Sequence, residues 1–165
     1  MNHIKKTSPY NIQPAQLADI PAILALFADE VKAGRMLPRD PEKMQAGIQD
    51  WRVTAEKEAI VGCVSLVFFN QTLCEIRSLA VDQDHRKNGL GKMLVEAALD
   101  LAKERGAAQV LTLTRAAGLF ERCGFQIDDI HNFPRKVQID CKNCPFIDCC
   151  DEVALLYTFK ESAKS

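Results

Sequence analysis

The segment RKNGLGK, residues 86–92, combines three basic side chains with two glycines that are separated by a single residue. Glycines let the backbone turn tightly, and successive N–H groups in such a turn form a concave anion site. An amphipathic segment follows, and a helix N-terminus adds unpaired N–H donors and partial positive charge. The spacing suits a pyrophosphate group, although glycines that only shape a strand-to-helix turn explain it equally well. The residues concerned are Arg86, Lys87, Asn88, Gly89, Leu90, Gly91 and Lys92.

A second cluster is CKNCPFIDCC, which places four of the seven cysteines within residues 141–150. The C-x2-C spacing of Cys141 and Cys144 is part of a zinc pattern, but the adjacent Cys149 and Cys150 could not easily bind one ion together. We therefore expect no metal and interpret the cluster as a compact loop of small apolar thiols. Structural zinc at Cys141, Cys144 and Cys150, or thiol redox chemistry, stay open as alternatives.

The apolar pattern predicts the elements that position these residues. Apolar residues at helical spacing run from Pro14 to a stop at Gly34, and another amphipathic helix begins at Leu90 and ends at Gly106. Shorter helices are predicted at 42–50 and 116–123, and strands at 51–55, 59–69, 73–81, 110–114, 125–130 and 152–159. This order predicts an α/β fold, with a central mixed, mostly antiparallel sheet flanked by helices.

Length and charge limit the classes of protein. A chain of 165 residues is expected to form a single domain, residues 1–165, with a loose lead-in at 1–13 and a cysteine-rich loop at 131–151. Lys and Arg total 21 against 22 Asp and Glu, and this balance argues against a general nucleic-acid binder. The apolar run LADIPAILALFA contains Asp19 and Pro21 and does not resemble a signal peptide. With no segment long enough to cross a bilayer, we expect no membrane partner and a cytoplasmic protein.

The pattern R-x-x-G-x-G after a strand that ends in LAV, followed later by FERCGF at 120–125, resembles the GNAT acetyltransferase superfamily. The resemblance covers about residues 15–160. The segments MLPRD, EIRSLAV, LTLTR and LFERCGF, with the C-x2-C-P-x4-C-D-E run, are most similar to the short, single-domain N-acetylglutamate synthases. The resemblance implies acetyl-CoA as co-substrate and transfer of its acetyl group to the α-amine of an amino acid. L-glutamate is the first acceptor to expect, in a step towards arginine.

The resemblance also assigns roles in cofactor binding. The glycine loop would hold the pyrophosphate of acetyl-CoA, and the backbone of Leu79, Ala80 and Val81 would pair with the pantetheine arm. An N–H group near Leu79 would polarise the thioester carbonyl. Phe120 would lie beside the cofactor, where GNAT enzymes often have a tyrosine that protonates the leaving thiolate. This departure leaves the general acid unassigned, with Tyr157 as another possibility.

Glu75 is the candidate general base, because an α-ammonium must lose a proton before it attacks a thioester. Strand alternation predicts that Glu75 shares one face with Arg77, Leu79 and Val81. The alternative is that Glu75 only pairs with Arg77 on the sheet surface. Three arginines fall in segments that match the amino-acid-binding branch and could bind substrate carboxylates: Arg39, Arg77 and Arg115.

Other hypotheses stay open at this stage. The acceptor could be another small amine or a protein N-terminus, or the chain could be a non-catalytic module that binds acetyl-CoA. GNAT proteins often dimerise through late strands, so the resemblance implies a possible homodimer.

Overall fold

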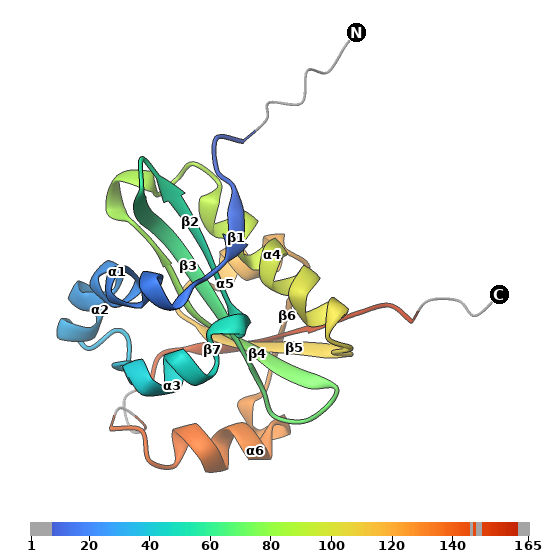
Figure 1. Cartoon of the computed structure of the whole chain (residues 1–165). Helices are drawn as coiled ribbons and strands as arrows, with labels where there is room; N and C mark the ends of the chain where they lie inside the picture. The colour runs from blue at the N-terminus through green and yellow to red at the C-terminus, as the bar shows by residue number, and fades with distance from the viewer. Residues whose placement is uncertain (1–7, 146, 148–149, 162–165) are drawn as a thin grey trace, which may run out of the picture.

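The computed structural model describes residues 8–145, 147 and 150–161. Seven strands form one sheet in the order β1-β2-β3-β4-β5-β7-β6, shown in Figure 1. Every neighbouring pair is antiparallel except β4 and β5, which are parallel, so the predicted mixed, mostly antiparallel sheet is confirmed. The strands are β1 (Ile12–Pro14), β2 (Trp51–Glu56), β3 (Ala59–Phe68), β4 (Leu73–Val81), β5 (Gln109–Thr114), β6 (Gln126–Asp128) and β7 (Val153–Thr158).

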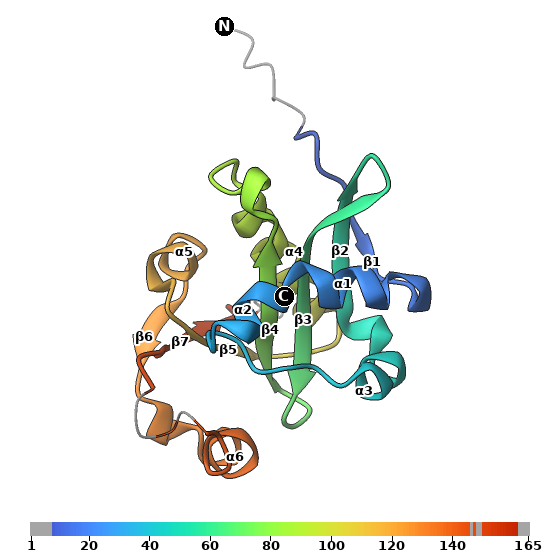
Figure 2. The same cartoon turned by 90° about the vertical axis from the view of Figure 1, so that its left-hand side faces the viewer.

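Helices cover both faces of this sheet, as the two views in Figures 1 and 2 show. The α-helices are α1 (Ile20–Leu26), α2 (Ala28–Lys32), α3 (Pro41–Ala46), α4 (Leu90–Glu104), α5 (Ala117–Arg122) and α6 (Pro134–Lys136). Short 3-10 turns lie at Leu17–Asp19, Ile48–Asp50, Gln83–His85 and Ile130–Asn132, and a π-helix spans Val137–Cys141. The apolar side of α4 packs on one face of the sheet, and residues of α1 and α3 pack on the opposite face with Trp51 and Val53.

Three predicted segments differ from the structure. The first helix is not continuous but is divided into α1 and α2 at Phe27, whose φ of −110° and ψ of 13° leave the helical range while its ring is buried. Strand β1 begins inside the predicted lead-in, because an edge strand tolerates Pro14, which lacks the N–H that a central strand would need. The predicted cysteine-rich loop contains α6 and the π-helix, since Pro134 suits the first turn of a helix and Phe133 is buried beneath it.

Close packing of α4 against the sheet depends on Gly62 in β3. A Cβ atom at this position would lie 2.9 Å from Cδ1 of Leu94 and 3.3 Å from Cδ2 of Leu90. Both leucines are fully buried, so neither has free space into which to move. Because Gly62 has no side chain, α4 can lie close to β3. The same close packing sets the position of the loop that precedes α4.

A β-bulge interrupts β4 at Ser78, whose φ is +54°. Cys63 of β3 pairs with Ala80, whereas Ser65, two residues later, pairs with Arg77, so β4 contains one extra residue. The extra residue reverses the alternation of side chains. Leu79 and Val81 therefore contact the α4 core, together with Ile76, and do not share a face with Glu75 and Arg77. The predicted common face of these four residues is wrong, because strict alternation assumes a regular strand.

Already before the bulge, β4 separates from its other neighbour, β5. Paired residues in β4 and β5 run only from Leu73 with Gln109 to Glu75 with Leu111. After Glu75 the two strands diverge, and the backbone of Ile76–Val81 has no partner strand on that side (Figure 2). The sheet thus opens into a V-shaped gap at the C-terminal ends of β4 and β5.

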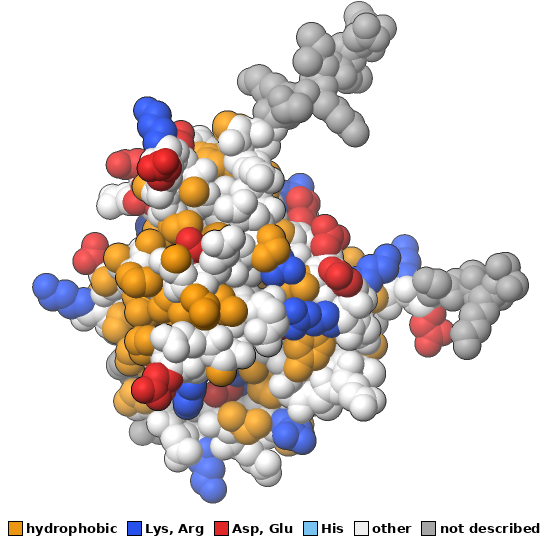
Figure 3. All heavy atoms as spheres, in the orientation of Figure 1, with side chains coloured by type: hydrophobic (Ala, Val, Ile, Leu, Met, Phe, Trp, Pro, Cys, Tyr) orange, Lys and Arg blue, Asp and Glu red, His pale blue; other side chains and the backbone are white. Residues whose placement is uncertain are grey.

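Two further features of the molecule are the distribution of charge on its surface and the character of its helices. On the face drawn in Figure 3, acidic and basic side chains are interspersed, unlike the continuous basic stripe of a nucleic-acid-binding surface. Within the part of the chain that the structure describes, no helix has the length and apolar character needed to cross a bilayer.

Candidate functional site

A cavity of about 950 Å³ occupies the gap between β4 and β5. Its wall includes residues of α2, of the connection from α2 to α3, of the loop before α4, of α5 and of the segment around α6. Its volume lies near the upper end of the usual range for small-molecule sites, roughly 300–1,000 Å³. The gap is therefore large enough for an extended cofactor together with a second small molecule.

The glycine loop lies at one end of this cavity, as the sequence predicts. Lys87 and Gly89 both have positive φ, at 67° and 79°, and Gly89 is the residue from which α4 begins. The loop residues that line the cavity are Arg86, Lys87, Gly89, Gly91 and Lys92, whereas the side chain of Leu90 is buried in the α4 core and Asn88 is exposed. Left-handed backbone followed by the N-terminus of a long helix directs N–H donors towards the cavity, which suits phosphate groups.

The second half of β4 forms the middle of the cavity wall. Leu79, Ala80 and Val81 line it, on the strand edge that has no partner. Backbone N–H and C=O groups at such an edge can pair with an extended ligand. The carbonyl oxygen of Val81 already accepts a hydrogen bond from Arg86, at 3.1 Å. The sequence-predicted residues for the pantetheine arm therefore lie where a chain of that kind could be bound.

Phe120 also lines the cavity, but it cannot act as an acid. Its ring is 2% exposed and packs edge-on against Phe125, with centroids 5.2 Å apart. The ring of Tyr157 contacts Phe125 and Phe159, at 5.4 Å and 5.0 Å, and Tyr157 is not part of the cavity lining. Its position indicates a packing role, and the general acid stays unassigned.

Glu75 lies at the opposite end of the cavity within a network of charges. Its side chain is buried, and Oε2 accepts a hydrogen bond of 2.8 Å from Nε of Arg77. This is the pairing that the alternative interpretation of Glu75 predicts. The network continues, however, because Oε1 lies 2.9 Å from Nζ of Lys136, and Asp140 contacts both Lys136 and Arg77.

Lys136 and Asp140 are cavity-lining residues that the sequence interpretation missed. Lys136 is 8% exposed, which is unusual for a lysine. The only sequence signal is that the two residues are four positions apart, which places opposite charges on one side of a helical turn. That signal is common on protein surfaces and does not by itself indicate a site.

Arg39 is the least satisfied of the predicted carboxylate-binding arginines. It is half-buried in the cavity wall, and its Nε donates a 2.8 Å hydrogen bond to the hydroxyl of Ser78. Among the residues that the structure describes, no carboxylate lies within ion-pair distance of it. Burial, and then the nearby charge of Arg77, lower the pKa of Arg39, as expected for a cation without a neutralising partner.

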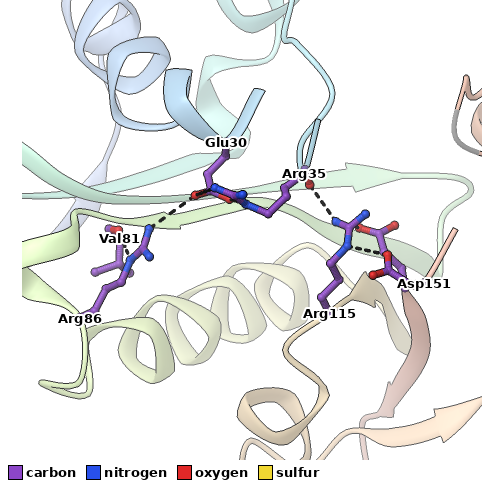
Figure 4. Close-up of polar contacts among 7 residues, drawn as sticks. Glu30, Arg35, Val81, Arg86, Arg115 and Asp151 are labelled. Carbon is purple, nitrogen blue, oxygen red and sulfur yellow. Dashed lines mark hydrogen bonds and ion pairs between the residues drawn. The ribbon is translucent and has the colours of Figure 1, made fainter. Parts of the chain in front are cut away.

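Arg115 and Arg86 are held at the mouth of the cavity by existing contacts (Figure 4). Arg115 donates hydrogen bonds of 2.6 Å to Asp151 and 2.9 Å to the carbonyl oxygen of Arg35. Arg86 donates to the carbonyl oxygen of Val81 at 3.1 Å and lies 3.9 Å from Glu30.

Glu30 lies between these two arginines in Figure 4 and also pairs with Arg35. The hydrogen bond from Arg35 lowers the pKa of Glu30, and burial raises the pKa of Glu152, which lies 3.5 Å from Arg115. An anionic ligand would have to compete with these carboxylates for the arginines at the mouth.

The cysteine cluster borders the same end of the cavity as Lys136. Cys144 and Cys150 are part of the lining, and Cys141 is half-buried. Cys149 lies outside the described residues. Among those that are described, no group of three or more His, Cys, Asp or Glu side chains is arranged to hold a metal ion.

The thiols should differ strongly in their reaction with iodoacetamide. Burial raises the pKa of Cys63 and of Cys74 to about 12, whereas Cys150 is exposed. A thiol pKa near 12 instead of about 8.5 lowers the thiolate fraction at neutral pH by roughly three orders of magnitude. We expect peptide mass spectrometry of the native protein to show early labelling at Cys150 and none at Cys63 or Cys74.

A sample labelled in urea is the control, in which all of these thiols react. Labelling of native Cys63 at the rate of Cys150 would contradict the buried position of β3.

His85 should make stability depend on pH. This residue precedes Arg86, and its ring nitrogens lie 2.6 Å from Glu56 and 2.9 Å from Asp82. Hydrogen bonds to Glu56 and then Asp82 raise the pKa of His85 above its usual 6.5. Its stabilising effect is therefore complete below the unfolded-state pKa and is lost as the pH rises through the folded-state pKa. We expect His85→Gln to lower the Tm more at about pH 6 than at about pH 9.

Thermal unfolding of both proteins across this range measures the difference in Tm. A difference that grows with pH would contradict the assigned contacts.

Comparisons with known proteins agree with this architecture. The sequence pattern of the acetyltransferase (GNAT) family matches residues 23–125. An uncharacterized N-acetyltransferase from Chlorobaculum tepidum is 37% identical over 147 residues, which cover 89% of this chain and 95% of that protein. An amino-acid acetyltransferase from Pasteurella multocida is 29% identical over 127 residues, 76% of this chain, and the match spans only 29% of that longer protein.

Solved structures show the same fold at lower identity. N-acetylglutamate synthase from Neisseria gonorrhoeae, in complex with coenzyme A and N-acetyl-glutamate, superposes with a TM-score of 0.82 at 24% identity. The match covers 94% of this chain and 36% of that one. A Mycobacterium tuberculosis protein in complex with CoA superposes with a TM-score of 0.74 at 22% identity, covering 91% of this chain and 99% of that one. The divergence of β4 and β5, the glycine loop before α4 and the match to the family pattern agree. The chain belongs to the GNAT family of acetyltransferases.

Proposed function

We propose that this acetyltransferase moves the acetyl group of acetyl-CoA to the α-amine of an amino acid, with L-glutamate as the first acceptor. The observation that carries the proposal is Arg39, a half-buried guanidinium without a carboxylate partner among the described residues, at the acceptor end of the cavity. A planar guanidinium binds a carboxylate through paired hydrogen bonds, so this position favours an acidic acceptor. The similarity to amino-acid acetyltransferases supports the same class of substrate, although the chain spans only about 29% of the length of the Pasteurella relative.

The cofactor would lie along β4. Arg86, Lys87 and Lys92 would neutralise its phosphates together with the N–H groups at the start of α4. The free edge of Leu79–Val81 would pair with the pantetheine arm, which brings the thioester towards Ser78 and Glu75. Coenzyme A in the solved structures of the Neisseria and Mycobacterium proteins supports this placement.

Two groups of the chain would then act on the reacting atoms. Glu75 would accept a proton from the acceptor ammonium, directly or through water, and the neutral amine would attack the thioester carbon. The N–H of Leu79, next to the bulge, would stabilise the oxyanion while the C–N bond forms and the C–S bond breaks. The electron pair of the broken bond leaves on the thiolate of coenzyme A, whose thiol pKa is near the cysteine range, so departure needs no strong acid. The second proton of the attacking nitrogen would pass to this thiolate, directly or through water, which gives the amide and the coenzyme A thiol.

The three predicted arginines would share the carboxylates of the acceptor. Arg39 is available without any rearrangement of ion pairs. Arg77 and Arg115 are paired with Glu75, Asp140, Asp151 and Glu152, so an incoming carboxylate would share or replace those partners. On this basis Arg39 contributes the largest net attraction for an acidic acceptor.

Turnover with a panel of the proteinogenic amino acids tests the proposal. Release of the coenzyme A thiol is followed at near-neutral pH, and the acetylated product is confirmed by mass because the protein has seven cysteines of its own. We expect L-glutamate to be acetylated with a higher kcat/KM than any other amino acid. Preference for a basic or apolar amino acid would contradict the role of Arg39.

One observation favours a second candidate, a module that binds acetyl-CoA without catalysis. Phe120 occupies the cavity wall with no proton to donate. Tight binding of acetyl-CoA, measured by calorimetry, with no product from amino acids, polyamines or peptide N-termini would support this candidate.

The proposal extends to arginine biosynthesis as the pathway, the cytoplasm as the location and a possible homodimer as the assembled form. The pathway and the location rest on similarity to amino-acid acetyltransferases. The homodimer rests on the resemblance to GNAT proteins.

A further inference from the structure

Lys136 is a buried cation that has no role in the proposed reaction so far. Its Nζ lies 2.9 Å from Oε1 of Glu75, while Arg77 donates to Oε2 of the same carboxylate at 2.8 Å. We propose that Lys136 is a positioning residue for acetyl transfer, which holds Glu75 in the one orientation that faces the acceptor. This inference rests on the proposed role of Glu75 as general base.

The segment that carries Lys136 is anchored to the sheet. Phe133 is 7% exposed and packs with Leu111 and Ala154, so the start of α6 is fixed against β5 and β7. Lys136 is the last residue of α6, and the π-helix Val137–Cys141 follows directly. The ammonium group therefore reaches Glu75 from a rigid base and not from a freely rotating surface side chain.

The π-helix completes the site around the ammonium group. The N–H of Lys142 bonds to the carbonyl oxygen of Val137 at 2.8 Å, five residues earlier, which widens this turn. Asp140 then lies 3.2 Å from Nζ of Lys136 and also contacts Arg77. Single π-turns of this kind occur frequently at functional sites.

Energetics argue against a purely structural role. Moving a lysine and a carboxylate out of water costs several kcal/mol per ion, and well-packed apolar side chains stabilise a core at least as well. The network also lines the cavity and is not enclosed in the core. An orienting function explains why a costly ion pair is present at this position.

The charges that surround Glu75 come from four parts of the chain. Lys136 and Arg77 each contact the carboxylate of Glu75 directly. The carboxylate of Asp140 contacts both of these cations and offsets part of their charge. The other charged or titratable groups close to Glu75 are Arg39, Glu152, Cys74 and Cys141. Of all these, only Lys136 and Arg77 bond to the carboxylate, so removing Lys136 leaves Oε1 free to rotate away.

The expected effect is a loss of turnover without a loss of cofactor binding. Lys136→Met should lower kcat by about 10–100-fold, a typical cost of misplacing a catalytic group, while the KM for acetyl-CoA stays unchanged. Lys136→Arg, which keeps the charge, should recover most of the activity. Lys142→Met is the matched control, because Lys142 is an exposed lysine of the same segment.

A double variant separates positioning from structure. If Lys136 acts through Glu75, then Lys136→Met added to Glu75→Gln should cause no further loss of kcat beyond that of Glu75→Gln alone. Losses that multiply in the double variant would overturn the inference and assign Lys136 a structural role. A wild-type kcat in Lys136→Met, measured alongside an inactive Glu75→Gln protein, would also overturn the inference. If Glu75→Gln itself keeps wild-type turnover, the proposed base fails, and the inference that depends on it fails for that separate reason.

Partial unfolding of Lys136→Met is recognised by its Tm. In that case the comparison is made with Lys136→Leu, which removes both the charge and the hydrogen-bond donor beside Oε1. Wild-type kcat in a folded Lys136→Leu would equally overturn the inference.

Discussion

Glu75→Gln should lower kcat by about 10²–10⁴-fold, the range that general-base catalysis typically contributes. Glutamine keeps the size of the side chain and an oxygen that accepts a hydrogen bond from Arg77 or Lys136, but it cannot take a proton from the acceptor. The residues proposed to bind the phosphates of the cofactor lie at the other end of the cavity, so the KM for acetyl-CoA should stay near its wild-type value. Steady-state kinetics with the best amino-acid acceptor gives both constants.

The change also removes a buried negative charge between two cations, so the fold must be verified by thermal unfolding. Glu104→Gln, at the exposed end of α4, is the control for a carboxylate that has no place in the cavity. Turnover within threefold of the wild type in a folded Glu75→Gln protein would reject the base. The carboxylate would then be only a partner of Arg77 and Lys136.

Arg39→Gln should raise the KM for the acidic acceptor by about 10–100-fold, because a hydrogen bond to a charged group contributes roughly 1.5–3 kcal/mol. The KM for acetyl-CoA should not change, since Arg39 forms its hydrogen bond with Ser78 and not with the glycine loop. Arg39→Lys should restore the charge but not the paired geometry, and should therefore recover only part of the affinity.

Arg135→Gln is the matched control, because Arg135 is an exposed arginine beside Lys136. Substrate saturation curves for both variants, with L-glutamate and with a neutral amino acid, separate charge recognition from general damage. Equal loss for the two acceptors would count against carboxylate binding by Arg39.

Elements with a strong local pattern could be predicted from the sequence. The strand at Leu73–Val81 is predicted with the bounds that the structure has, because the turn at residues 70–72 precedes it and a polar, glycine-bearing loop follows it. The helix beginning at Leu90 follows from its apolar stripe. Both predictions depend only on residues that are near in sequence, so they need no knowledge of the tertiary structure.

The bulge at Ser78 could not be predicted in this way. Its cause is a pairing of one residue of β3 with two of β4, and no residue type at positions 77–79 requires a positive φ. The consequence is large, since every side chain after the bulge changes face. Glu75 and Leu79 were predicted for the same site, and both line the cavity, but through opposite sides of the strand.

The ion-pair and hydrogen-bond partners of charged residues could not be predicted from the sequence either. Residue type and the matching segments predict three carboxylate-binding arginines. Only the fold shows that Arg115 is already bonded to Asp151, whereas Arg39 donates to the neutral hydroxyl of Ser78. Lys136 was missed because burial of a lysine depends on what packs around it, here Phe133 and the sheet beneath. Sequence periodicity contains no information on such long-range contacts.

The short pairing between β4 and β5 separates the sheet into two parts, β1–β4 and β5–β7. Among the described residues, strands β1–β4 pair with strands β5–β7 only from Leu73 with Gln109 to Glu75 with Leu111, and the side chains of α4 and the ion pair of Glu75 with Lys136 add contacts between the two parts. The glycine loop follows the first half, whereas Arg115 and the segment before β7 belong to the second. A molecule that lies in the gap and bonds to both parts would add further contacts between them. We therefore expect a ligand in the cavity to stabilise the present separation of the two parts of the sheet.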